Sequence, residues 1–209
     1  MRKLEILIGI SEWVATLLGI IILAPLLLFI AILVKATSSG PVFYISERLG
    51  RNGRLFRLYK FRSMRVNSPQ ITAADGKVLT LEQDPRLTPI GGLLRLGFDE
   101  LPQLFNVIRG EMALVGPRPD VPWELHRYNA RERRRLEVLP GITGLSQVVG
   151  GRQMNNAQNY ELDVRYVETA SYGTDLMILL VTIPYSLGMK TIGCRLLGKY
   201  MVGIESFGL

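Results

Sequence analysis

An uncharged, mostly apolar stretch near the N-terminus constrains the fold more than any other feature of this sequence. Residues 13–34, WVATLLGIIILAPLLLFIAILV, contain no charged side chain. As a helix, such a stretch can cross the hydrocarbon core of a bilayer, which is about 30 Å thick. It is too long for the apolar part of a secretory signal peptide, and no small-residue cleavage site follows it cleanly. Its length and apolarity also argue against the core helix of a soluble protein, so the sequence predicts a membrane-embedded helix.

Pro25 and the charged flanks indicate how this helix meets the membrane. Pro25 lies in the middle of the stretch, where it removes a backbone donor and clashes with the preceding turn. Cations beside a membrane segment favour the cytoplasmic side, and here both flanks are basic: Arg2 and Lys3 on one side, Lys35, Arg48, Arg51, Arg54 and Arg57 on the other. A helical hairpin that enters and leaves the membrane through one face places both basic flanks on the cytoplasmic side, whereas a spanning helix places Arg2 and Lys3 on the opposite side of the membrane. The hairpin is favoured, with the spanning helix as the alternative.

The remaining composition narrows the possible partners without choosing among them. The 209 residues carry a formal net charge of +7, which favours anionic partners such as nucleic acid, acidic lipid or phosphorylated substrates. The single cysteine, Cys194, excludes an intrachain disulfide and a cysteine-based zinc cluster, and we expect it to be buried as a small apolar residue. No GxSxG-like motif accompanies the single histidine, His126, which we expect on the surface.

The segments after the membrane helix predict a mixed α+β domain with few strands that sits on the membrane. Residues 42–49 and 54–63 flank Asn52-Gly53, and an Asn-Gly pair between two such runs is typical of a β-hairpin with a primed turn. Further helices are expected at residues 86–96, 122–138 and 158–168, a loop at 67–84, and an apolar segment at 175–189 that packs on the core or lies in the membrane interface.

The segment 100–109, ELPQLFNVIR, predicts a helix that ends before Gly110. Asp99 stands at the N-cap position, and Pro102 is tolerated in the first turn. The apolar residues expected on one face of this helix are Leu101, Leu104, Phe105 and Ile108.

Two interpretations remain open for the adjacent acids Asp99 and Glu100. Acidic residues at a helix start are favoured by capping and by the helix dipole, which would make both structural. Alternatively, one carboxylate attacks a phosphoryl group while a Mg²⁺ ion takes carboxylate and phosphate oxygens and screens their repulsion.

Two turns near these acids could contact phosphate. Arg118 lies between two prolines in Gly116-Pro117-Arg118-Pro119, and its guanidinium fork matches phosphate geometry. Residues 140–147, PGITGLSQ, form a glycine-rich turn, followed by Gly150-Gly151-Arg152. Glycines let backbone amides approach a phosphate closely, although no P-loop lysine follows here. Both turns could equally be structural.

The order of four motifs resembles the bacterial sugar transferase family, the monotopic phosphoglycosyl transferases. These motifs are KFRSM (60–64), DELPQLFNVIRGEM (99–112), LVGPRP (114–119) and LPGITGLSQV (139–148), and the resemblance covers about residues 5–190. It implies an enzyme in which Asp99 attacks the β-phosphate of a UDP-sugar, releases UMP and carries a phosphosugar that polyprenyl (undecaprenyl) phosphate then removes.

The resemblance also implies roles for the surrounding residues. Glu100 would assist Asp99 and share a Mg²⁺ ion with it. The residues implied as phosphate or substrate contacts are Lys60, Arg62, Arg95, Arg118 and Arg152. The sequence departs from the family at Leu94 and Gly97, where the family has an arginine and a small hydroxyl residue, so Arg95 would have to replace that arginine from one position further on.

The implied organisation has three parts: a re-entrant membrane helix–break–helix over residues 1–36 with Pro25 at the break, a mainly helical cytoplasmic catalytic domain over residues 37–190, and a C-terminal tail over residues 191–209. A small β-hairpin and interfacial amphipathic helices belong to the catalytic domain. The resemblance implies that the catalytic domain lies on the cytoplasmic face of the bacterial inner membrane, with membrane lipid as a partner. It also implies that the enzyme carries out the first membrane step of glycoconjugate biosynthesis. A homodimer is compatible with it, and the sequence does not identify the sugar.

Three other functions compete with this one. A membrane-anchored interaction protein would have no use for two acids beside a rigid arginine turn. Nucleic-acid binding through Arg131 and residues 133–135 lacks a recognisable motif, and a solvated or lipid-facing helix explains that run better. A classical metal-dependent glycosyltransferase would require a DxD motif in a nucleotide-binding βαβ setting, which is not evident.

Overall fold

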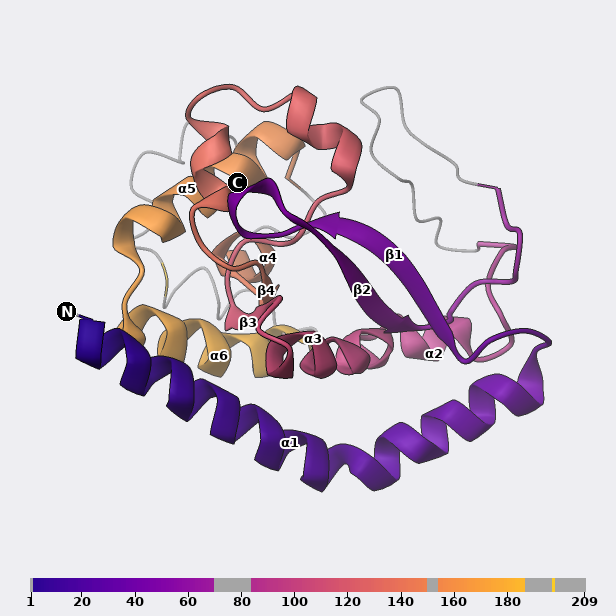
Figure 1. Ribbon diagram of the computed structural model, residues 1–209. Coiled ribbons are helices and arrows are strands. Elements are labelled where there is room, and N and C mark those ends of the chain that lie inside the picture. Colours follow the sequence, from indigo (N-terminus) through magenta and orange to yellow (C-terminus); the bar gives the residue numbers. More distant parts are fainter. Residues whose placement is uncertain (1, 70–83, 150–153, 187–196, 198–209) are drawn as a thin grey trace.

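A long bent helix lies along one side of a mixed helical and β-stranded domain (Figure 1). The computed structural model describes residues 2–69, 84–149, 154–186 and Leu197. The helix, α1, comprises Arg2–Thr37 and contains Pro25. Within the described residues it is the one helix whose length and composition would let it cross a membrane, over Ser11–Thr37. This agrees with the predicted apolar helix.

Both arms of α1 contact the same side of the domain. In the first arm, Trp13 Nε1 donates to the carbonyl oxygen of Ile108 at 3.2 Å. In the second, Ile30 and Val34 are buried in a cluster that includes Phe61 and Leu94. The middle of α1 bends (Figure 1) and is exposed, with Ile22 76% accessible. A proline within the helix removes one backbone bond and is a common cause of such a bend.

The predicted β-hairpin is confirmed. Strands β1 (Phe43–Leu49) and β2 (Leu55–Phe61) pair antiparallel, with Leu49 opposite Leu55. The connection includes a short 3-10 turn, η1 (Arg51–Gly53). Asn52 and Gly53 both have positive φ, 58° and 74°, as a primed turn requires.

The helix predicted over residues 100–109 differs at its start. Its first part is a 3-10 segment, η2 (Phe98–Gln103), which continues into α3 (Leu104–Ile108). The residue before η2 is Gly97, with φ 118° and no capping side chain, so the expected N-cap role of Asp99 is wrong. A left-handed glycine turns the chain directly into the 3-10 segment, so within the described residues the Asp99 carboxylate forms no capping hydrogen bond.

The neighbourhood of this segment also differs from expectation. The helix expected over residues 86–96 is only the single turn α2 (Gly91–Leu94). The most buried residues of η2 and α3 are Pro102, Gln103, Asn106 and Val107. Of the apolar residues expected on one face, Leu101, Leu104 and Ile108 are half-buried and Phe105 is 40% accessible.

Two short parallel strands form the centre of the domain. β3 (Ala113–Val115) pairs with β4 (Gly141–Thr143). A Cβ atom on Gly141 would lie 2.0 Å from the backbone nitrogen of Gly116, and one on Gly144 would lie 2.1 Å from its carbonyl oxygen. The glycines of the PGITG turn therefore permit close packing against the Gly116 turn, which is the structural alternative for this turn.

The main hydrophobic core lies between the remaining helices, α4 (Leu145–Val149), α5 (Asn156–Thr169) and α6 (Tyr172–Ser186). A capping box of Asn155 and Gln158 begins α5, in agreement with the helix predicted at residues 158–168. The apolar segment at 175–189, predicted to pack on the core or lie in the membrane interface, is helical as α6 over its described residues and packs on the core. Its inner side chains Ile178 and Val181 are fully buried, while Leu176, Leu180 and Ile183 are exposed.

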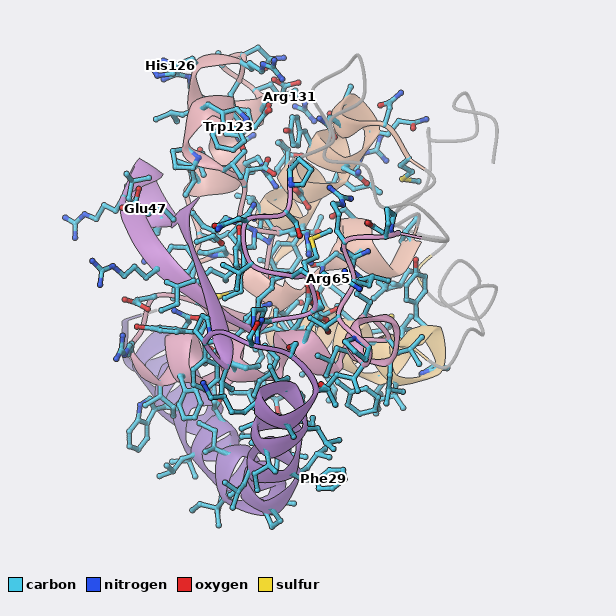
Figure 2. The ribbon with its side chains drawn as sticks, turned by 90° about the vertical axis from the view of Figure 1, so that its right-hand side faces the viewer. Phe29, Glu47, Arg65, Trp123, His126 and Arg131 are labelled. Carbon is cyan, nitrogen blue, oxygen red and sulfur yellow. The ribbon has the colours of Figure 1, made fainter. Side chains whose placement is uncertain are left out.

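The single basic helix predicted over residues 122–138 is wrong. The structure has two separate 3-10 segments, η3 (Pro122–His126) and η4 (Glu132–Leu136). The Asn129 side chain accepts hydrogen bonds from the backbone nitrogens of Arg131 and Glu132 and so begins a new turn between them. Figure 2 shows His126 exposed, as expected, at the end of the molecule opposite Phe29 of α1.

Candidate active site

Two cations from separate elements converge on one oxygen of Glu100. Lys60 Nζ, from β2, lies 2.7 Å from Glu100 Oε1. Arg118 Nη2, from the turn after β3, lies 2.8 Å from the same oxygen. The glutamate therefore joins the hairpin, the 3-10 segment η2 and the arginine turn in one cluster.

The charges in this cluster perturb one another. Burial alone would raise the pKa of Glu100, but Arg118 and Lys60 outweigh it and hold that pKa well below its usual range. Burial lowers the pKa of Lys60, and Glu100 only partly compensates. Glu100 in turn raises the pKa of Arg118. Glu100 is thus an ionised residue that orients two cations.

Asp99 differs from its neighbour, because its carboxylate accepts no hydrogen bond from the part of the chain that the structure describes. It is partly buried, and this burial is the main cause of its raised pKa. The charge of Glu100 raises the pKa further, while Lys60 and Arg118 lower it. A carboxylate with uncommitted lone pairs beside two cations can act as a nucleophile toward an anionic electrophile.

A buried asparagine fixes the hairpin against the acidic segment. Asn106 of α3 is fully inaccessible. Its Nδ2 donates to the carbonyl oxygen of Arg57 at 2.7 Å, and its Oδ1 accepts from the backbone nitrogen of Tyr59 at 3.1 Å. These bonds hold β2, and with it Lys60, at a set distance from η2.

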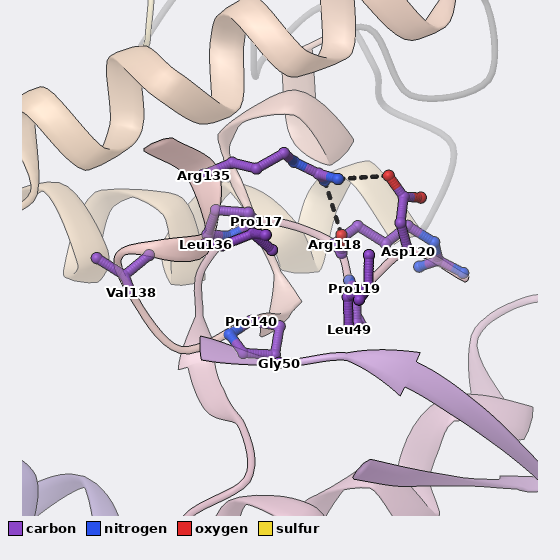
Figure 3. A pocket seen from close by; sticks show the side chains of 10 residues that line it. All are labelled: Leu49, Gly50, Pro117, Arg118, Pro119, Asp120, Arg135, Leu136, Val138 and Pro140. Atoms are coloured by element: carbon purple, nitrogen blue, oxygen red, sulfur yellow. Dashed lines mark hydrogen bonds and ion pairs between the residues drawn. The ribbon is translucent and has the colours of Figure 1, made fainter. Parts of the chain in front are cut away.

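Arg135 fixes the turn that carries Arg118 by a hydrogen bond and an ion pair (Figure 3). Arg135 is only 4% accessible. It donates to the carbonyl oxygen of Arg118 at 2.8 Å and pairs with the Asp120 carboxylate. A second pair, to Asp163 at 2.6 Å, connects it to α5. The sequence interpretation of this basic run as solvated or lipid-facing is therefore wrong for Arg135. Arg131 and Arg134 pair with glutamates of α5.

The structure separates the residues predicted to contact phosphate. Lys60 and Arg118 lie in the cluster. Arg62 is buried and donates to the carbonyl oxygens of Ser38, Ser39 and Pro41, so it holds the chain that leads from α1 into β1. Arg95 lies 3.4 Å from Asp84, yet its charge still lowers the pKa of Asp99. Arg152 lies outside the described residues.

Two further arginines near the cluster, Arg48 and Arg135, were not predicted as site residues from the sequence. Arg48 of β1 is partly buried, and its charge interacts with those of Arg118 and Glu100. Strand alternation could have indicated it, because Arg48 lies four residues from Tyr44, the partner of Lys60 in the hairpin. No sequence signal distinguishes Arg135 from the exposed arginines beside it.

The two acids fit a magnesium ion only if a substrate completes the site. Among the residues that the structure describes, no group of three or more acidic, cysteine or histidine side chains could hold a metal by itself. Asp99 and the second oxygen of Glu100 remain available. Mg²⁺ usually binds through one or two carboxylates, substrate phosphates and water, which this pair can accommodate.

The apolar helix and the charged cluster define a membrane-associated protein whose site combines a free carboxylate with cations suited to phosphate groups. The chain belongs to the bacterial sugar transferase family, which matches it over residues 5–188. It is therefore a transferase.

Similar proteins include an exopolysaccharide production protein, ExoY, from Sinorhizobium fredii, which is 39% identical over 88% of this chain and 83% of its own length. The undecaprenyl-phosphate glucose phosphotransferase of Komagataeibacter xylinus is 39% identical over 83% of this chain. The undecaprenyl-phosphate galactose phosphotransferase of Salmonella typhimurium is 39% identical over 81%. This chain spans only 36% and 38% of the lengths of these two phosphotransferases.

Proposed function

We propose that the protein transfers a sugar-1-phosphate from a UDP-sugar to polyprenyl phosphate through a covalent intermediate on Asp99. The observation that carries this proposal is the contrast between the two acids. Glu100 is engaged by Lys60 and Arg118, whereas Asp99 beside it accepts no hydrogen bond from the described residues. The names of the two similar phosphotransferases support undecaprenyl phosphate as the acceptor.

In the first step, an Asp99 oxygen attacks the β-phosphorus of the donor. The bond from that phosphorus to the bridging oxygen breaks, and UMP leaves with the bonding electron pair. Lys60 and Arg118 would bind the donor phosphates, and their contacts with Glu100, the acid next to the nucleophile, support this role. The product on the enzyme is a mixed anhydride of Asp99 and the sugar phosphate.

In the second step, a phosphate oxygen of the acceptor attacks the same phosphorus. The carboxylate of Asp99 leaves and is regenerated, and the product is a polyprenyl diphosphate sugar. Asp99 and Glu100 would hold Mg²⁺ together with substrate phosphates, and the ion would supply neutralisation of the charge that develops on UMP.

We also propose that α1 enters and leaves the membrane through the cytoplasmic face. Its two arms both contact the domain, while Phe29 projects away from the domain (Figure 2). The exposed apolar side chains of Leu93, Leu96, Leu176, Leu180 and Ile183 would then lie in the interface. This arrangement keeps the polyprenyl chain in lipid and its phosphate within reach of Asp99.

The experiment is a panel of UDP-sugars assayed for UMP release with polyprenyl phosphate present. Asp99→Asn should abolish release with every donor that the wild type accepts, because the amide is a poor nucleophile. Glu47→Gln, on the exposed edge of the hairpin, is the control and should retain wild-type rates. Turnover by Asp99→Asn would refute the nucleophile and leave both acids as metal ligands for direct transfer.

A further inference from the structure

Arg48 is a cation of the site that forms no ion pair with the residues that the structure describes. The other cations nearby are engaged: Lys60 and Arg118 by Glu100, and Arg95 by Asp84. Within the described residues, the guanidinium of Arg48 makes one hydrogen bond, from Nε to Ser46 Oγ at 3.3 Å. Both terminal nitrogens, Nη1 and Nη2, are left available.

Arg48 lies on the face of the hairpin that carries the Lys60 side chain of the cluster. Side chains alternate along β1, so Tyr44, Ser46 and Arg48 share the face that carries Lys60, the strand partner of Tyr44. Figure 2 shows Glu47, of the opposite alternation, at the outer edge of the hairpin. The next backbone nitrogen, that of Leu49, donates to the carbonyl oxygen of Asp120 at 2.8 Å and so holds the end of β1 beside the Arg118 turn.

The acids of the described residues compensate the charge of Arg48 only in part. Burial lowers the pKa of Arg48, and the positive charge of Arg118 lowers it further, while Tyr44, Asp120 and Glu100 raise it without cancelling this effect. A further acid that acts on Arg48, Asp120, is already bound by Arg135 and by the hydroxyl of Tyr128. Among the described residues, the cations Lys60, Arg118 and Arg48 thus share the acids Asp99 and Glu100, with Asp120 already bound elsewhere. A partly buried guanidinium with two free donors beside another arginine is stabilised when an anion binds between them.

We propose that Arg48 binds a phosphate group of the substrates, and so is a third phosphate-binding cation beside Lys60 and Arg118. This inference rests on the proposed function and adds a residue that the motifs did not indicate. The phosphate can come from the donor diphosphate or from the acceptor. The two half-reactions separate these sources.

The test compares Arg48→Met and Arg48→Lys with Arg57→Met, which removes an exposed arginine from the other face of the same hairpin. UMP release in a single turnover without acceptor reports the donor step. Transfer from the preformed adduct to polyprenyl phosphate reports the acceptor step. Hydrogen bonds to charged groups contribute enough for a loss of about 10- to 100-fold in whichever step uses Arg48. Arg48→Lys should recover part of this loss, since it keeps the charge without the fork.

Two results would overturn the inference and can be told apart. If the wild type turns over while both half-reactions of Arg48→Met stay within about twofold of Arg57→Met, Arg48 binds no phosphate and the proposed function stands. If the wild type releases no UMP from any UDP-sugar, the proposed function fails and this inference fails with it. Equal melting temperatures of the three variants would exclude misfolding as the cause of a loss.

Discussion

Replacing Arg135 with methionine should destabilise the domain and disable the site together. The side chain is 4% accessible and pairs with Asp163, whose side chain is 2% accessible. It also donates to the hydroxyl of Tyr128 and the carbonyl oxygen of Arg118. Removing one partner of a buried ion pair leaves an uncompensated buried charge and costs about 3–5 kcal/mol. Because domains are stable by only about 5–15 kcal/mol, this is a large fraction of the total.

Urea unfolding of the detergent-solubilised protein measures the free energy of unfolding, and UMP release measures the effect on Arg118. Arg134→Met is the matched control. Arg134 adjoins Arg135 in sequence but is 40% accessible and pairs with Glu168 and Glu137. Exposed pairs contribute at most about 1 kcal/mol, so this variant should unfold and turn over nearly as the wild type does. A loss below about 1 kcal/mol in Arg135→Met would refute the reasoning that this network supports the Arg118 turn.

Three further changes test other parts of the structure. Lys60 lowers the pKa of Asp99, so Lys60→Met should raise that pKa. As pH falls, Asp99 would then become protonated earlier, and the acid limb of the kcat/KM profile should move to higher pH. An unmoved acid limb would contradict this. Gly141→Ala would place a Cβ atom 2.0 Å from the Gly116 nitrogen and should cost about 1–3 kcal/mol or more by thermal unfolding, whereas Gly92→Ala, with nothing within 4 Å, should be tolerated. Pro25→Leu should favour an α1 that spans the membrane. On a Cys194→Ser background with Pro25 present, cysteines introduced by Lys3→Cys and Ser38→Cys should both be labelled from the cytoplasm. In the Pro25→Leu variant, the cysteine at position 3 should instead be labelled from the periplasm.

Local signals in the sequence predicted the elements that local interactions determine. A primed turn requires positive φ at two successive residues, which Asn52 and Gly53 adopt and few other pairs allow. This pair was therefore enough to predict the hairpin. The apolar run of α1 and the helix over residues 158–168, which corresponds to α5, were also predicted. The candidate site was predicted in part, because Asp99, Glu100, Lys60 and Arg118 lie in recognisable motifs.

Long-range packing determined what the sequence could not indicate. Arg135 stands in a run of arginines that looks uniformly solvated, and only its burial against α5 distinguishes it from Arg134. Arg62 stands two residues from Lys60, yet it follows the end of β2 and turns to the α1–β1 connection. Asp99 was expected to cap a helix, but the left-handed Gly97 makes that cap unnecessary.

The most direct measurement of the central claim is the mass of the protein after mixing with a UDP-sugar that it accepts, in the absence of polyprenyl phosphate. The account predicts that the mass increases by one sugar phosphate on a peptide that contains Asp99, with UMP released to about one equivalent per enzyme at most. Added polyprenyl phosphate should then remove the adduct. Strict dependence of UMP release on the acceptor, with no adduct trapped on Asp99, would contradict a covalent intermediate.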